Sequence, residues 1–116
     1  MTLALLNFEL PDPLLAQLRQ RFPQLTIERC PDKASLFAQL PRAEILMTFM
    51  QCSREMLDAA PNLKWIQAIS AGVDFMPLSE IRRRGIRLTC GRGTSTIQMA
   101  EYALAAMINQ IGRAHV

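Results

Sequence analysis

The sequence predicts an α/β protein in which a parallel sheet of about five strands is covered by helices on both faces. Half of the 116 residues are apolar and 20% are charged, which suits one ordinary domain with a buried core. Short apolar runs alternate along the chain with segments of helical spacing. Capping residues, prolines and glycines separate these segments, so most elements have a recognisable start and end.

Five short apolar runs are predicted to be strands. Because a helical segment follows each run, the strands are expected to be parallel and joined by right-handed crossovers. This is the doubly wound, flavodoxin-like arrangement, in which ligands bind just beyond the carboxyl ends of the strands. The runs cover residues 3–8, 25–29, 45–49, 64–69 and 86–90.

The first two helices carry start and stop signals. Asp12 is predicted to be an N-cap, followed by Pro13 at the first helical position. Apolar residues then recur at helical spacing as far as Phe22. Asp32 is predicted to cap the second helix, and Pro41 to end it.

The third and fourth helices are shorter. Ser53 is predicted to cap the third, which ends before Pro61. Residues 77–84 fit a brief helix that Gly85 closes.

The last segment differs from the others because it is apolar on nearly every side. Ser95 and Gln98 form a capping box that marks its start. Only Gln98, Glu101 and Asn109 make a polar strip. A helix of this kind is normally buried on several sides. We therefore expect a cover that is missing from this chain, either another domain or a partner subunit.

Cysteine and histidine usage excludes several kinds of site. Cys30, Cys52 and Cys90 are odd in number and widely spaced, so neither a disulfide framework nor a structural zinc site is expected. A reducing, cytoplasmic location is the default. His115 is the single histidine, so a histidine triad or histidine metal cluster within the chain is nearly excluded.

Charge and hydropathy argue against two classes of partner. The formal net charge is +3, and the one basic cluster is residues 82–84 at a predicted helix end, without interleaved aromatic residues. That pattern is typical of a solvated helix face rather than a nucleic-acid site. No apolar run approaches the roughly 20 residues that a membrane helix needs.

Two glycine-containing loops follow predicted strands. Residues 70–74 (SAGVD) are small enough for their amides to form an anion-binding nest, although a plain glycine turn explains them too. Residues 91–94 (GRGT) precede the last helix and could bind an anion at its start. A tight strand-to-helix connection explains this second loop better, because the dinucleotide glycine motif is incomplete.

Residues 61–67 (PNLKWIQ) and 70–74 (SAGVD) resemble segments of the D-isomer-specific 2-hydroxyacid dehydrogenases, in particular the glyoxylate/hydroxypyruvate reductase branch. The similarity continues through residues 84–89 (RGIRLT) and 99–104 (MAEYAL). It implies a two-domain enzyme, with a flavodoxin-like substrate domain followed by a Rossmann domain that binds NAD or NADP. The catalytic histidine, its acid and the substrate-binding arginine lie in the second domain of such enzymes. No catalytic residue is therefore expected in this chain.

The resemblance also implies a division of the chain. Residues 1–93 form the substrate-binding domain, and residues 94–109 form a helix that crosses to the missing Rossmann domain and contributes to a homodimer. Residues 110–116 resemble the translation of a common sequencing adapter and are expected to be a non-native tail.

The expected ligand is a small 2-oxo or 2-hydroxy carboxylate. The loop after the fourth strand would grip its carboxylate, mainly through the amides of Ala71 and Gly72. Cys90 stands where many relatives have asparagine, so no side-chain role is assigned to it. The residues expected to bind substrate are Met50, Gln51, Ser70, Ala71, Gly72 and Val73.

The alternative function is a non-catalytic binding or interaction module of the same fold, with its last helix buried against a partner. A phosphoreceiver domain fits poorly, because Asn7, Glu9 and residues 48–50 do not supply the acidic cluster and phosphoacceptor that it needs.

Overall fold

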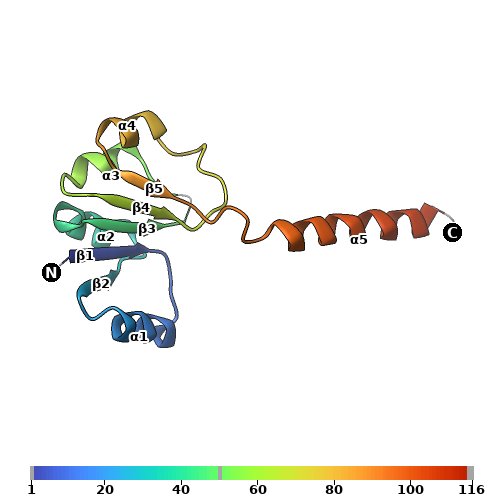
Figure 1. Ribbon diagram of the computed structural model, residues 1–116, viewed down its shortest axis with the longest axis horizontal. Coiled ribbons are helices and arrows are strands. Elements are labelled where there is room, and N and C mark those ends of the chain that lie inside the picture. The colour runs from blue at the N-terminus through green and yellow to red at the C-terminus, as the bar shows by residue number, and fades with distance from the viewer. Residues whose placement is uncertain (1, 50, 115–116) are drawn as a thin grey trace.

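The computed structural model describes residues 2–49 and 51–114, which form a five-stranded parallel sheet followed by a projecting helix (Figure 1). The strand order β2-β1-β3-β4-β5 is that of a flavodoxin-like sheet. The predicted fold class is therefore confirmed. The strands are β1 (Thr2–Asn7), β2 (Leu25–Arg29), β3 (Ile45–Thr48), β4 (Trp65–Ala68) and β5 (Arg87–Thr89).

Five α-helices and one 3-10 turn connect and follow the described strands. Two of the predicted caps are confirmed: the Asp32 side chain accepts the amide of Ser35, and that of Ser53 accepts the amide of Met56. The helical elements are α1 (Asp12–Arg21), α2 (Lys33–Gln39), η1 (Leu40–Arg42), α3 (Arg54–Ala59), α4 (Leu78–Arg83) and α5 (Thr96–Ala114).

The predicted cap at Asp12 is wrong. Pro11 occupies the N-cap position without a side-chain hydrogen bond, and its carbonyl accepts the amides of Leu14 and Leu15. The helix thus begins at Asp12 itself. The Asp12 carboxylate instead forms an ion pair with Nη1 of Arg29, 2.8 Å away on β2.

The buried side chains of β1 alternate between the two faces of the sheet, as a central strand requires. Leu3 and Leu5 belong to the larger core, which α2, α3 and α4 cover. Ala4 and Leu6 face the other way and pack beneath α1. Helices therefore lie on both faces, three on one and α1 on the other (Figure 1).

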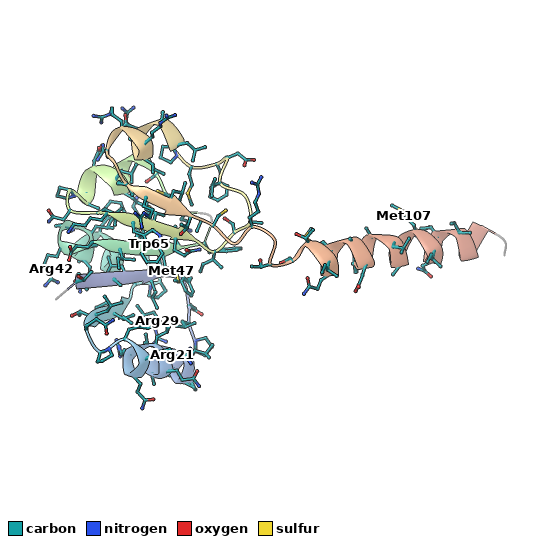
Figure 2. The ribbon with its side chains drawn as sticks, viewed as in Figure 1. Arg21, Arg29, Arg42, Met47, Trp65 and Met107 are labelled. Carbon is teal, nitrogen blue, oxygen red and sulfur yellow. The ribbon has the colours of Figure 1, made fainter. Side chains whose placement is uncertain are left out.

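The α1 face of the sheet is only partly covered. An apolar groove of about 280 Å³ remains beside α1, lined in part by Leu6, Leu18 and Met47. Met47 and Trp65 lie along this face in Figure 2. The Trp65 side chain is partly exposed, and its Nε1 donates to Oγ1 of Thr89 at 2.8 Å.

The helix α5 extends away from the sheet domain, on the side to which the strands' carboxyl ends point (Figure 1). Its large apolar side chains are exposed, with Ile97 at 71% and Tyr102 at 78%. Met107 also stands in solvent (Figure 2). The helix continues to Ala114, past the expected boundary at residue 109. Among the described residues, no helix is long and apolar enough to cross a membrane.

The three cysteines are free, and two of them belong to the core. Cys30 and Cys52 are buried, whereas Cys90 is partly exposed. Burial raises the pKa of the Cys52 thiol to about 11, so this group stays protonated and unreactive near neutral pH. His115 lies outside the described residues.

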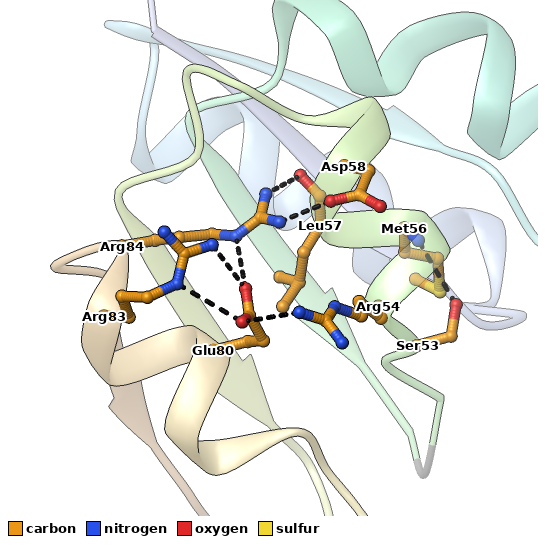
Figure 3. A network of polar contacts seen from close by, with 8 residues as sticks. All are labelled: Ser53, Arg54, Met56, Leu57, Asp58, Glu80, Arg83 and Arg84. Atoms are coloured by element: carbon orange, nitrogen blue, oxygen red, sulfur yellow. Dashed lines mark hydrogen bonds and ion pairs between the residues drawn. The ribbon is translucent and has the colours of Figure 1, made fainter.

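A charged cluster joins α3 to α4 (Figure 3). The Glu80 carboxylate accepts from Arg54 at 2.9 Å, from Arg83 at 2.8 Å and from Arg84 at 3.3 Å. Arg84 also donates to the Leu57 carbonyl at 2.8 Å. These guanidinium groups lower the pKa of Glu80 to about 2, with the hydrogen bond from Arg83 as the largest cause. The basic residues at the end of α4 are thus largely paired within the fold.

Replacing Glu80 with glutamine is expected to make the free energy of unfolding depend less on pH in the acid range. The pKa of Glu80 is lower in the folded protein than its ordinary value of 4.5. Its stabilisation is therefore complete above about pH 4.5 and is lost as the pH falls towards about 2. Urea unfolding midpoints measured across this range should fall more steeply for the unmodified chain than for Glu80→Gln. Glu9→Gln, which removes an exposed carboxylate, should keep the steep dependence. Parallel profiles for the unmodified chain and Glu80→Gln would contradict this assignment.

Candidate functional site

Two loops meet at the carboxyl edge of the sheet, because the strands before them are paired. Thr48 of β3 lies opposite Ala68 of β4, and the Ile69 amide donates to the Thr48 carbonyl at 2.9 Å. The loop at residues 49–53 and the loop at residues 69–77 therefore start side by side. Gln51 and the segment from Ser70 to Val73 lie on these neighbouring loops. Met50 lies outside the described residues.

The segment from Ser70 to Val73 contains backbone amides that have no backbone acceptor. Within the described residues, the amides of Ala71, Gly72 and Val73 donate to no backbone carbonyl. Ala71 and Gly72 are exposed. The Ser70 hydroxyl donates to the Gly72 carbonyl at 2.8 Å and so occupies that acceptor within the loop. This arrangement suits the binding of an anion by successive N–H groups.

Gly72 is not required by the local backbone. Among the described glycines, only Gly85 and Gly93 have positive φ angles. A Cβ atom at Gly72 would lie 3.5 Å from Oδ1 of Asp74, which is an ordinary contact. Neither backbone conformation nor packing therefore calls for glycine at residue 72, whereas close approach of a ligand would.

At Gly91, unlike at Gly72, packing within the fold requires glycine. A Cβ atom there would lie 2.8 Å from the Ile69 carbonyl oxygen, and the Gly91 amide donates to the Ser70 carbonyl at 3.0 Å. The Thr94 hydroxyl closes the turn by donating to the Gly91 carbonyl at 2.7 Å. The turn at residues 91–94 is thus a tight connection that supports the Ser70 loop, as the sequence favoured.

Gln51 is held by two buried polar residues. Nδ2 of Asn7 donates to Oε1 of Gln51 at 3.3 Å and to Oγ1 of Thr48 at 3.4 Å. The Thr48 hydroxyl donates to the Gln51 carbonyl at 2.6 Å. Sequence reasoning did not assign Asn7 or Thr48 to the site. The available signal was a polar residue at the end of each of two apolar strands.

A hollow of about 560 Å³ opens beside Gln51. Its wall includes Lys33 and Phe37 of α2 and Phe75 of the neighbouring loop. Ser70 to Val73 are not part of this wall and lie on the open surface instead. The candidate site therefore has donors and a hollow beside them, but no cover over the Ser70 loop among the described residues.

The arrangement supplies binding groups rather than proton-transfer groups. Histidine is absent from residues 2–49 and 51–114. Within those ranges, no three side chains of the metal-binding types come together. Asp74 and Glu101, the acids near the strand ends, are both exposed. What the described residues of this edge offer chemically is a set of backbone amides without backbone acceptors, at Ala71, Gly72 and Val73.

Comparison with known proteins shows the family. The family model described as the D-isomer specific 2-hydroxyacid dehydrogenase catalytic domain matches residues 4–110. The chain belongs to this family. The glyoxylate reductase of Thermofilum pendens is 28% identical over 104 residues, covering 85% of this chain and 31% of that protein.

Solved structures share the family fold. A protein of Thermus thermophilus is 30% identical, has a TM-score of 0.72, and aligns with 98% of this chain and 40% of its own. An NADPH-dependent glyoxylate/hydroxypyruvate reductase of Sinorhizobium meliloti, solved with NADP and malonate, has a TM-score of 0.73 at 21% identity. It aligns with 93% of this chain and 34% of its own. The chain thus spans between about a third and two fifths of the length of these similar proteins.

Proposed function

We propose that this chain is the substrate-binding portion of an NAD(P)-dependent oxidoreductase that reduces 2-oxo acids, such as glyoxylate or hydroxypyruvate, to D-2-hydroxy acids. The observation that carries the proposal is the exposed loop at Ala71 and Gly72, whose amides donate to no backbone carbonyl within the described residues. Family membership supplies the reaction class. The two together point to the substrate carboxylate as the anion that this loop binds.

In this proposal the loop orients the substrate. Two adjacent N–H groups at Ala71 and Gly72 would hold the two carboxylate oxygens, since charge-assisted hydrogen bonds are stronger than neutral ones. The missing Cβ at Gly72 lets the carboxylate approach the backbone. The site stays open to water in this chain. We propose that a second domain covers it and brings the catalytic groups.

The nicotinamide cofactor belongs to that second domain in this proposal, and when bound it supplies the hydride. In the turn at residues 91–94, the Gly91 amide donates to the Ser70 carbonyl and is therefore not available to a cofactor phosphate. The fragment alone is therefore expected to be inactive. The choice between NAD and NADP would be made outside this chain.

We further propose that residues 94–109 cross to the cofactor domain and contribute to a homodimer. The exposed apolar side chains of α5 support this.

Nucleic acid is not a proposed partner, because Arg83 and Arg84 are paired with Glu80 and Asp58. A membrane is not proposed either. The free cysteines suit a reducing compartment such as the cytoplasm.

Titration of the isotope-labelled chain with glycolate, followed by amide NMR, tests the proposal. The Ala71 and Gly72 amide signals should shift and saturate. The dissociation constant should be on the order of 10 mM, since two charge-assisted hydrogen bonds at an open loop are worth about 3 kcal/mol.

Ethylene glycol, which lacks the carboxylate, is the matched ligand control and should leave both signals in place. The same chain should oxidise no NADH or NADPH in the presence of glyoxylate. Glycolate shifts spread over other loops, with Ala71 and Gly72 unmoved, would refute carboxylate binding here.

A further inference from the structure

We propose that two copies of this chain exchange their last helices, so that α5 of each copy packs into the apolar groove beside α1 of the other. Both surfaces are apolar and open, and each chain carries one of each. The inference rests on the part of the proposed function that places residues 94–109 in a homodimer, and it adds the surface that receives the helix. Carboxylate binding at the Ser70 loop does not depend on it.

The floor of the groove is the sheet face beside α1. Strand pairing sets the groove-lining residues of β1, β3 and β4 in two rows across this face. Trp65 in one row and Phe22 on α1 both line the groove and are both exposed. A helix laid over these rows would complete the layer in which α1 already lies, as a sheet covered on both faces requires. The rows are Ala4–Ile45–Trp65 and Leu6–Met47–Gln67.

The groove has a polar edge at β5. Arg87 lies opposite Trp65 in the strand register, and Thr89 lies opposite Gln67. Because Leu88 packs against the core on the other face, Arg87 and Thr89 face the groove side. Arg87 is exposed and forms no ion pair with the other described residues. The apolar floor is thus bordered on one side by a cation.

The helix α5 carries the complementary pattern. At about 100° per residue, Ile97, Leu104 and Ile108 fall on one stripe, and Glu101 lies at the edge of that stripe. Glu101 is exposed and is the one acidic residue of α5. The stripe from Ile97 to Ile111 is about 21 Å long, close to the roughly 20 Å of the six-residue β1. One of the two directions in which the helix can lie along the groove therefore turns Glu101 towards the cation at β5.

The short connection after β5 keeps α5 away from its own groove, and the helix projects from the domain (Figure 1). The Gly91 amide donates to the Ser70 carbonyl at 3.0 Å, and the Thr94 hydroxyl donates to the Gly91 carbonyl at 2.7 Å. Only residues 92–95 then separate Gly91 from the start of α5, and they reach about 14 Å when fully extended.

The groove lies at the limit of this reach. Over β3, its position is about 10 Å to the side of β5, because neighbouring strands lie about 4.8 Å apart, and about 10 Å above the sheet, as packed layers do. These two displacements combine to about 14 Å. The chain's own helix would reach the groove only with its linker fully stretched and the turn at residues 91–94 broken. A second copy supplies the same helix with that turn intact, so the second copy is the occupant.

Two charge reversals test the exchange in the 116-residue chain. Glu101→Arg and Arg87→Glu each place like charges together in both halves of a homodimer. Each variant alone should therefore dimerise with a dissociation constant about tenfold higher than that of the unmodified chain. Mixed in equal amounts, the two variants should regain the unmodified affinity in sedimentation equilibrium. In the mixed dimer, the two reversed charges face each other in one half and the two natural charges in the other.

Trp65 gives a second readout, because it is the single tryptophan of the chain and lines the groove. Its fluorescence emission should move to shorter wavelength as the unmodified chain is concentrated, in step with the rise in molecular mass. Arg82→Glu makes the same charge change at an exposed position of α4, on the other face of the sheet. It is the matched control and should dimerise as the unmodified chain does.

Three outcomes would overturn the exchange. The first is a mixture of the two variants that dimerises no better than either variant alone. The second is a dimer that forms without a change in Trp65 emission. The third is short-wavelength Trp65 emission in a monomer, which would place α5 in its own groove.

The carboxylate site is tested separately by the glycolate shifts of Ala71 and Gly72. Glycolate shifts without helix exchange overturn this inference alone. Helix exchange without glycolate shifts overturns the carboxylate site alone.

Discussion

Replacing Gly72 with valine is expected to weaken glycolate binding by about tenfold or more, because the branched side chain would occupy the space through which the carboxylate reaches the backbone. Folding should be almost unaffected. The φ angle of Gly72 is not in the positive region, and a Cβ atom there meets nothing closer than Oδ1 of Asp74 at 3.5 Å. The effect is therefore expected in the ligand affinity and not in the melting temperature.

A paired variant separates binding from folding. Gly85 has a φ of +69° and lies at the end of α4, away from the Ser70 loop. Gly85→Ala should cost about 1 kcal/mol of stability, since alanine is strained at positive φ, while leaving glycolate affinity unchanged. Amide NMR titrations and thermal melts of both variants give the comparison. If Gly72→Val mainly lowers the melting temperature, the loop is a structural turn and the glycine has no role in binding.

Ending the chain after Thr94 is expected to change its association state. The large apolar side chains of α5 are between 59% and 78% exposed, and a helix this apolar is stabilised by burying its face. The 116-residue chain should therefore self-associate, as light scattering across a concentration series would show. The shortened chain should be monomeric and retain its sheet. The exposed apolar residues of α5 are Ile97, Met99, Tyr102, Leu104, Met107, Ile108 and Ile111.

Charge substitutions on the same helix make this prediction sharper. Leu104→Lys combined with Ile108→Lys should abolish self-association, because both residues are large, apolar and exposed. Gln98→Lys combined with Asn109→Lys adds the same charge on the polar strip and should leave it intact. If the 116-residue chain stays monomeric and binds no dye for exposed apolar surface, a missing cover over α5 is contradicted. Association that persists in the shortened chain would point to the open groove beside α1 instead.

Much of the fold was readable from near neighbours in the sequence. The caps at Asp32 and Ser53 each involve a residue three positions away, so the pattern is local. The alternation of Leu3 and Leu5 with Ala4 and Leu6 is local too. The predicted cap at Asp12 was wrong by one residue, because the helix begins at Asp12 with Pro11 in the N-cap position. The Asp12 carboxylate contacts Arg29 of the next strand, a contact that the local sequence does not reveal.

In the candidate site, too, features that are local in the sequence were predicted, and contacts between distant segments were not. The sequence placed the Ser70 loop correctly at a strand end, since strand and loop are adjacent in the chain. It did not reveal that Asn7 holds Gln51, because 44 residues separate them and only the pairing of β1 with β3 brings them together. Met50 stays a prediction, since it lies outside the described residues.

The amino-acid order alone was enough to predict the succession of strands and helices and the excess apolar character of the last helix. These properties depend on periodicity and capping within short segments. The folded arrangement was needed to establish that Gly91 is packed against a backbone carbonyl while Gly72 is open, and that Oε1 of Gln51 accepts a hydrogen bond from Asn7. Such approaches occur between strands distant in sequence, and they exist only once the parallel sheet has formed.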